Sequence, residues 1–344
     1  MRGDISLTRT KSSTGFFMLR TMENSSFHKV FILTGLQQSE KNKSLYFYLT
    51  CTLYILIIAM NVTIIITVRV DKALHEPMYI FLSNLCANGL YGTVGFYPKF
   101  LIDLLSDVAV ISYPQCVTQT YVIYSSAVCE ITILTAMAFD RYVAICRPLQ
   151  YHSIFTSHMV LKLLSLAWFY PASVSVVAIV LTVRVPICGS FISKLFCDIP
   201  SILKRGCYQT TVNRIFGIIL MMGQVIQVLL ICVSYVQIVR VCLRSRAGRR
   251  RFTQTCLPHI IALFVSILSL LFDLSCSWAD TTNLSLDLRN VLGMQFLILP
   301  PICNPLVYGL QLPQIRRAIL KTYLKTKVSK NKRNNRRSVI KAIG

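Results

Sequence analysis

The sequence predicts an all-α membrane protein: a bundle of seven transmembrane helices followed by a short amphipathic helix on the inner leaflet. Of the 344 residues, 54% are apolar or aromatic and 14% are charged, whereas about a quarter of the residues in a soluble domain are charged. The mean hydropathy is +0.58, even though the net charge is +23. This composition excludes a disordered chain and argues against a soluble nucleic-acid-binding protein, so the lipid bilayer is the expected partner.

Seven apolar runs are long enough to cross a bilayer, which takes about 20 helical residues. The expected spans are Leu45–Arg69, Met78–Leu101, Cys116–Phe139, Met159–Leu181, Val212–Val239, Thr255–Trp278 and Val291–Gly309. The loops between them are short, so there is no room for a separate soluble domain. The chain then divides into an N-terminal arm (1–44), expected to be disordered, a membrane domain (45–309), an amphipathic helix (310–326) and a basic tail (327–344).

Lys and Arg residues set the expected orientation, because cytoplasmic loops carry an excess of them. With the N-terminus outside and the C-terminus in the cytosol, 22 of the 36 Lys and Arg residues lie on the inner side. The glycosylation sequons at Asn24, Asn42 and Asn283 then lie outside. These features predict a multi-pass plasma-membrane protein. Met22 is an alternative start to Met1.

The segment after the seventh expected span is amphipathic, with basic residues opposite an apolar stripe formed by Ile315, Ile319, Leu320, Tyr323 and Leu324. Such a helix lies along the membrane surface. The basic tail that follows is similar in composition to a nucleic-acid-binding patch. Next to a membrane, however, we expect the tail to attract anionic lipid, and we expect no nucleic acid as a partner.

Four of the 13 cysteines lie on the expected outer side, namely Cys116, Cys188, Cys197 and Cys207. An even number in an oxidising compartment suits two disulfides, and four cysteines allow three pairings. A zinc site is the alternative, although none of the four has CxxC spacing. Apart from a cation site at Glu130, considered below, we expect no metal and no cofactor.

The most informative string is at the inner end of the third expected span, where residues 137–148 read MAFDRYVAICRP. Its Asp140, Arg141 and Tyr142 resemble the motif of rhodopsin-like (class A) G-protein-coupled receptors, and the extended string is similar to that of the olfactory receptor family. The resemblance runs from about Phe27 to Lys325. It includes the residues Asn61, Pro77, Met78, Tyr79, Ser234, Tyr235, Asn304, Pro305 and Tyr308.

The resemblance implies a receptor that switches between two states and activates a heterotrimeric G protein. Arg141 can pair with Asp140 in one state and meet the partner in the other, while Pro305 lets the seventh helix bend. The implied coupling residues are Asp140, Arg141, Tyr142, Tyr235, Asn304, Pro305 and Tyr308. The resemblance also implies a Cys116–Cys197 disulfide, which leaves Cys188 to pair with Cys207.

Gly89 and the Ser266–Ile267 pair depart from the pattern of these receptors, whereas Glu130 matches an acidic position found in many olfactory receptors. Glu130 is an acid inside the third span, where charge is costly and marks a functional site, but Gly89 stands where related receptors have a second, cation-binding acid. Glu130 is therefore either a cation site or a protonated, hydrogen-bonded acid. In the sixth span, Ser266 and Ile267 replace a Phe-Tyr pair frequent in olfactory receptors, so a divergent, fish-type branch is one interpretation.

The expected ligand site lies between the outer halves of the helices and is apolar, which suits a small, neutral or weakly polar odorant. Its candidate residues are Ile123, Tyr124, Ala127, Val128, Ile219, Gly223, Ile267, Leu271 and Leu274. The resulting hypothesis is an odorant receptor acting through a stimulatory, olfactory-type G protein that raises cAMP. A receptor for a non-odorant ligand and a seven-helix transporter or channel are the alternatives. Without a nucleophile elbow, phosphate loop or His-rich cluster, an enzyme is not expected.

Overall fold

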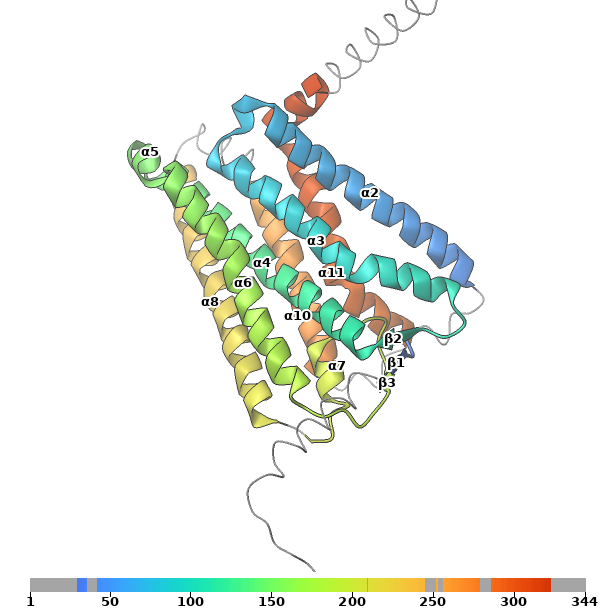
Figure 1. Ribbon diagram of the computed structural model, residues 1–344. Coiled ribbons are helices and arrows are strands. Elements are labelled where there is room, and N and C mark those ends of the chain that lie inside the picture. The colour runs from blue at the N-terminus through green and yellow to red at the C-terminus, as the bar shows by residue number, and fades with distance from the viewer. Residues whose placement is uncertain are drawn as a thin grey trace, which may run out of the picture.

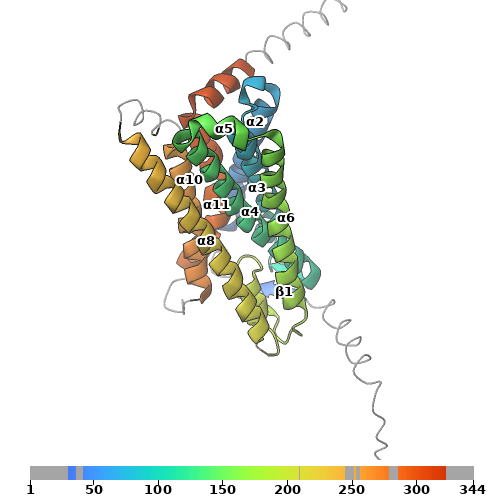
Figure 2. The same cartoon turned by 90° about the vertical axis from the view of Figure 1, so that its left-hand side faces the viewer.

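The fold is mostly helical. The computed structural model describes residues 30–35, 42–208, 210–244, 252, 256–278 and 286–322. In this part of the chain, seven helices of 22 residues or more pack side by side (Figures 1 and 2): α2 (Lys43–Val70), α3 (Pro77–Leu105), α4 (Tyr113–Cys146), α6 (Ser157–Val183), α8 (Thr211–Cys242), α10 (Leu257–Trp278) and α11 (Leu286–Gln311). The central helix is α4, which contacts α3, α6, α8 and α10.

Five helices in the described ranges are long and apolar enough to cross a membrane: α2, α4, α6, α8 and the Asn290–Gly309 part of α11. The α3 helix has 29 residues but is more polar, because it contains Asn88 and Asp103, which it buries against its neighbours. In α10 the apolar stretch within the described residues is Leu257–Leu271. The composition therefore supports a multi-pass membrane protein, with five of the seven expected spans apparent from hydropathy alone.

A proline inside α11 leaves free the backbone carbonyl through which α11 is hydrogen-bonded to α2. Pro305 has no N–H group, so the carbonyl of Pro301, four residues earlier, loses its partner within the helix. Asn61 of α2 donates to that carbonyl from Nδ2 at 2.8 Å. Asn61 is 1% exposed, so this bond satisfies a group that would otherwise be buried without a partner.

A small sheet closes the end of the bundle where α2 begins (Figure 1). Strand β1 (Val30–Leu33) lies between β2 (Val110–Ser112) and β3 (Phe191–Ile192), antiparallel to the first and parallel to the second. Phe31 and Leu33 of β1 are buried in an apolar cluster beneath the sheet. The expectation of a disordered arm therefore does not hold for residues 30–35, because alternate apolar side chains anchor them.

Short elements gather at the opposite end of the bundle: η2 (Lys72–Leu74), η3 (Pro148–Gln150), α5 (Tyr151–Ile154) and a helix over residues 313–322 (Figure 1). In that last helix Ile315 and Ala318 are buried while Arg316 and Arg317 are exposed. Lys321 Nζ lies 3.4 Å from Asp71 Oδ2, which ties the helix to the loop after α2. The segment is thus helical and amphipathic, and its expected members Tyr323 and Leu324 lie outside the described residues.

Candidate functional site

A buried ion pair lies near the C-terminal end of α4, at the end of the bundle where α5 lies. Asp140 is fully buried, and Arg141 Nε donates to its Oδ2 at 2.8 Å. The Tyr151 hydroxyl, on α5, donates to Asp140 Oδ1 at 2.8 Å. Burial, followed by the charge of Asp140, raises the pKa of Tyr151 above its ordinary value, so the phenol remains a hydrogen-bond donor at neutral pH. A hydrogen bond from the segment after α4 thus fixes the Asp140 carboxylate, which in turn fixes the Arg141 guanidinium.

The local sequence explains how Tyr151 reaches the ion pair. Residues before a proline avoid the helical conformation, and α4 ends at Cys146 with Arg147 in a non-helical conformation before Pro148. Pro148 starts η3, which turns the chain so that Tyr151 returns to Asp140, eleven residues earlier. Tyr142 packs elsewhere, since the Arg147 guanidinium lies 5.9 Å from the centre of its ring.

Three side chains from other helices lie near Arg141. Tyr235 of α8 hydrogen-bonds to Nδ1 of His259 on α10. Tyr308 of α11 is 1% exposed, and within the described residues its hydroxyl has no hydrogen-bond partner. Arg141 is within electrostatic reach of all three side chains. The structure therefore brings Arg141, Tyr235 and Tyr308 together, and adds His259, which lies near the start of the sixth expected span but was not among the expected coupling residues.

Glu130 lies near the middle of α4, ten residues before Asp140. Its Oε1 accepts hydrogen bonds from Ser266 Oγ of α10 at 2.7 Å and from Asn304 Nδ2 of α11 at 3.1 Å. Ser266, noted in the sequence as an unusual residue, is therefore a direct partner of the intramembrane acid. Asn304 and the adjacent Pro305 are both buried in α11, so the acid is linked to the same stretch that bends that helix.

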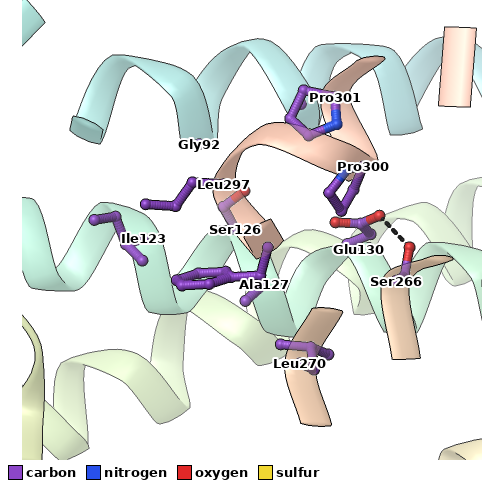
Figure 3. A pocket seen from close by; sticks show the side chains of 12 residues that line it. Gly92, Ile123, Ser126, Ala127, Glu130, Ser266, Leu270, Leu297, Pro300 and Pro301 are labelled. Atoms are coloured by element: carbon purple, nitrogen blue, oxygen red, sulfur yellow. Dashed lines mark hydrogen bonds between the residues drawn. The ribbon is translucent and has the colours of Figure 1, made fainter. Parts of the chain in front are cut away.

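A cavity adjoins Glu130 between α3, α4, α10 and α11 (Figure 3). Its lining is mainly apolar or small and consists of Gly89, Gly92, Ile123, Ser126, Ala127, Glu130, Ser266, Leu270, Phe296, Leu297, Pro300 and Pro301. The room for water-sized occupants is about 30 Å³, and one water needs about 10–15 Å³ on this measure. In this conformation the cavity therefore holds about two waters, and a larger occupant needs it to widen.

The candidate ligand residues are dispersed over several surfaces. Ile123 and Ala127 line the cavity, and Tyr124 packs against an apolar cluster around Phe96. Of the remaining candidates with described side chains, Val128 and Ile267 are half-buried, Gly223 faces Tyr170 on α6, and Ile219 and Leu271 are 60% and 55% exposed. The Leu274 side chain lies outside the described residues. Contact of these residues with a ligand stays a prediction.

The end of the bundle that has the sheet is fixed by two disulfides, Cys116–Cys197 and Cys188–Cys207. These four cysteines are therefore not available to zinc, and no group of three or more His, Cys, Asp or Glu residues within the described ranges is placed to hold a metal ion. Asn42 is exposed immediately before α2, while Asn24 and Asn283 lie outside the described residues. Glycosylation at all three sites stays a prediction.

The helical bundle, its apolar spans and the buried charge pair define a multi-pass helical membrane protein with a polar site at one end of the bundle. The olfactory receptor family model matches residues 50–326. Olfactory receptor 6N1 of Homo sapiens is 34% identical over 296 residues, covering 84% of this chain and 93% of its own length. Olfactory receptor 10G4 of Homo sapiens is 35% identical, covering 87% and 96%, and Olfactory receptor 2C1 of Mus musculus is 31% identical, covering 87% and 96%. The chain belongs to the olfactory receptor family, which consists of G-protein-coupled receptors and not of enzymes.

Proposed function

We propose that this protein is an odorant receptor of the plasma membrane that crosses the bilayer seven times and activates a heterotrimeric G protein. The proposed G protein is of the stimulatory, olfactory type, so that activation raises cAMP. Family membership supports the general role. The single observation that carries the mechanism is the Asp140–Arg141 pair, in which Asp140 is buried and the charge of Arg141 acts on Tyr235 and Tyr308.

The two ends of the bundle support an orientation with the N-terminus outside. One end has the sheet and two disulfides, which need an oxidising compartment. The other end has α5 and the basic helix over 313–322, as expected for a cytosolic surface. Antibody labelling of epitopes at both chain ends, before and after permeabilisation, tests this topology. Labelling of both ends on the same side would contradict it.

The proposed switch is a change in the partners of Arg141. In the conformation seen here Asp140 and Tyr151 hold the inner end of α4. A ligand that binds better to a second conformation shifts the population toward it. In that conformation the inner ends of the helices separate and Arg141 meets the G protein. The proposed coupling set remains Asp140, Arg141, Tyr142, Tyr235, Asn304, Pro305 and Tyr308.

The proposed ligand is a small molecule that binds between the outer halves of the helices. Ile123 and Ala127 support this position, because they are the predicted contacts that also line the cavity. The room for about two waters implies that the ligand selects a wider state of the bundle, which provides the differential binding that a switch requires.

The test is an odorant panel applied to cells that express the protein together with an olfactory-type G protein. We expect a ligand-dependent rise in cAMP that Arg141→Ala abolishes while surface expression is kept. Arg184→Ala is the matched control, because Arg184 is exposed at the C-terminal end of α6, and it should respond like the wild type. Substrate uptake or ion current without any G protein would instead favour a transporter or channel.

A further inference from the structure

The cavity between α3, α4, α10 and α11 has one ionisable lining residue, Glu130. Two serines are the other polar side chains in the lining, and the rest is apolar or glycine. Both described hydrogen bonds to Glu130, from Ser266 and Asn304, reach Oε1. Figure 3 shows the other carboxylate oxygen directed into the cavity. An ionised carboxylate only accepts hydrogen bonds, and its second oxygen has room for more donors.

Within the described part of the chain, Glu130 has no basic side chain at ion-pair distance. Arg141 is eleven residues further along the same helix, about 16 Å away by helical rise, and it is paired with Asp140. A carboxylate in the middle of a membrane protein is costly without a positive partner. The site therefore favours an occupant that brings positive charge and hydrogen-bond donors.

The neighbouring amides of Asn304 and Asn61 have oxygen atoms without a described partner. Asn304 uses Nδ2 on Glu130, and its Oδ1 has no partner among the described residues. Asn61 uses Nδ2 on the carbonyls of Ile57 and Pro301, and its Oδ1 likewise has none. That Oδ1 lies 3.5 Å from where a Cβ on the cavity-lining Gly89 would stand. Both asparagines are more than nine-tenths buried, so each has a buried acceptor without a described partner, one on the residue that donates to Glu130 and one beside the cavity-lining Gly89.

We propose that this cavity binds the ammonium group of a small primary amine, with Glu130 as its counter-ion. An ammonium group has three donors, which match the open oxygen of Glu130 and the unused amide oxygens. It is close to a water molecule in size, so the present cavity admits the head group. The alkyl chain then lies toward Ile123, about 10 Å from Glu130 along α4 by helical rise, and toward Leu297 of α11, which also lines the cavity.

This inference rests on the proposed function, because it names amines as the class of odorant. A direct binding measurement distinguishes a failure of the amine site from a failure of the proposed function. The experiment measures thermal unfolding of the purified full-length protein in lipid nanodiscs with pentylamine hydrochloride, pentanol or sodium pentanoate. It also compares sodium chloride with N-methyl-D-glucamine chloride at equal ionic strength. We expect pentylamine to raise the Tm with an apparent Kd at least tenfold lower than that of pentanol, and pentanoate to have no effect.

Variants assign this selectivity to Glu130. Glu130→Gln should weaken pentylamine binding at least tenfold and leave pentanol binding nearly unchanged. The control is Glu76→Gln, which changes an exposed acid before α3 that makes no side-chain cap, and it should bind like the wild type. If Glu130→Gln does not fold, Glu130→Asp keeps the charge and should bind the amine more weakly, while Ala127→Leu keeps the acid but fills the cavity and should exclude the amine.

Equal binding of pentylamine and pentanol, or full pentylamine binding by Glu130→Gln and Ala127→Leu, overturns the inference. Stabilisation by sodium that depends on Glu130, without any by pentylamine, also overturns it and assigns the site to an inorganic cation. A cAMP response to other odorants without amine binding leaves the proposed function standing and refutes the amine site. Amine binding without any G-protein response supports the amine site and refutes the proposed function.

Discussion

Replacing Tyr151 with Phe should raise the basal activity of the protein. The substitution removes only the hydroxyl that donates to Asp140 at 2.8 Å, and the ring still packs against Phe155, 5.4 Å away between ring centres. A hydrogen bond to a charged group contributes about 1.5–3 kcal/mol. Since Tyr151 is half-buried, the lower end applies, and about 1.4 kcal/mol corresponds to a tenfold change in an equilibrium.

The consequence depends on which conformation the bond stabilises. If it forms only in the conformation seen here, its loss shifts the equilibrium about tenfold toward the active state, so a basal population of about 1% becomes about 10%. The assay is ligand-free cAMP in cells with an olfactory-type G protein, normalised to receptor at the surface. Tyr208→Phe is the control, because Tyr208 is 54% exposed in the loop before α8. Basal cAMP equal to that of the wild type would refute the reasoning, since the bond would then be equally strong in both states.

Three further predictions concern stability and are read as the Tm and surface expression of the intact protein. In Gly92→Ala the new Cβ would overlap Ser126 Oγ, so we expect the free energy of unfolding to fall by about 1–3 kcal/mol. Adding Ser126→Ala should partly restore it. A Tm equal to that of the wild type would contradict this, because it would mean that α3 and α4 accommodate the methyl group without cost. Phe31→Ala empties a fully buried site beneath the sheet and should cost about 3–5 kcal/mol, whereas the exposed Val30→Ala should cost little. Loss of the Cys188–Cys207 disulfide through the Cys188→Ser, Cys207→Ser double variant should cost about 2–4 kcal/mol, and equal Tm values with and without reductant in the wild type would contradict this.

The long helices were predictable because apolar runs of about 20 residues have few alternatives in a bilayer. The hydropathy criterion was weakest for α3, where Asn88 donates to the Ser126 carbonyl and Asp103 pairs with Lys99. These residues lower the hydropathy of the helix, although each is buried and makes a hydrogen bond or ion pair within the protein. Hydropathy measures the side chain and not its partners, so it understates a helix that buries polar contacts.

Contacts between distant segments could not be read from the sequence. Strand β1 pairs with residues about 80 and 160 positions later, and four apolar residues in a polar arm were too short to indicate where they would dock. Similarly, Glu130 was identifiable as a buried acid, but its bonds to Ser266 and Asn304 depend on the angles between three helices. Local patterns specify elements, whereas packing specifies which polar groups meet.

The distribution of covalent and polar links indicates where the bundle can move. At the end that has the sheet, two disulfides, the sheet and the bond from Asn290 Nδ2 to the Gly35 carbonyl at 2.7 Å join α4, the loop before α8 and α11. At the end that carries Arg141 no disulfide joins the described helices, and the Tyr308 hydroxyl is buried without a described partner. Rearranging this end therefore breaks a few hydrogen bonds, and it can give Tyr308 a partner. Opening the other end would disrupt a sheet and its apolar cluster, so the energetically easier motion is at the end that carries Arg141.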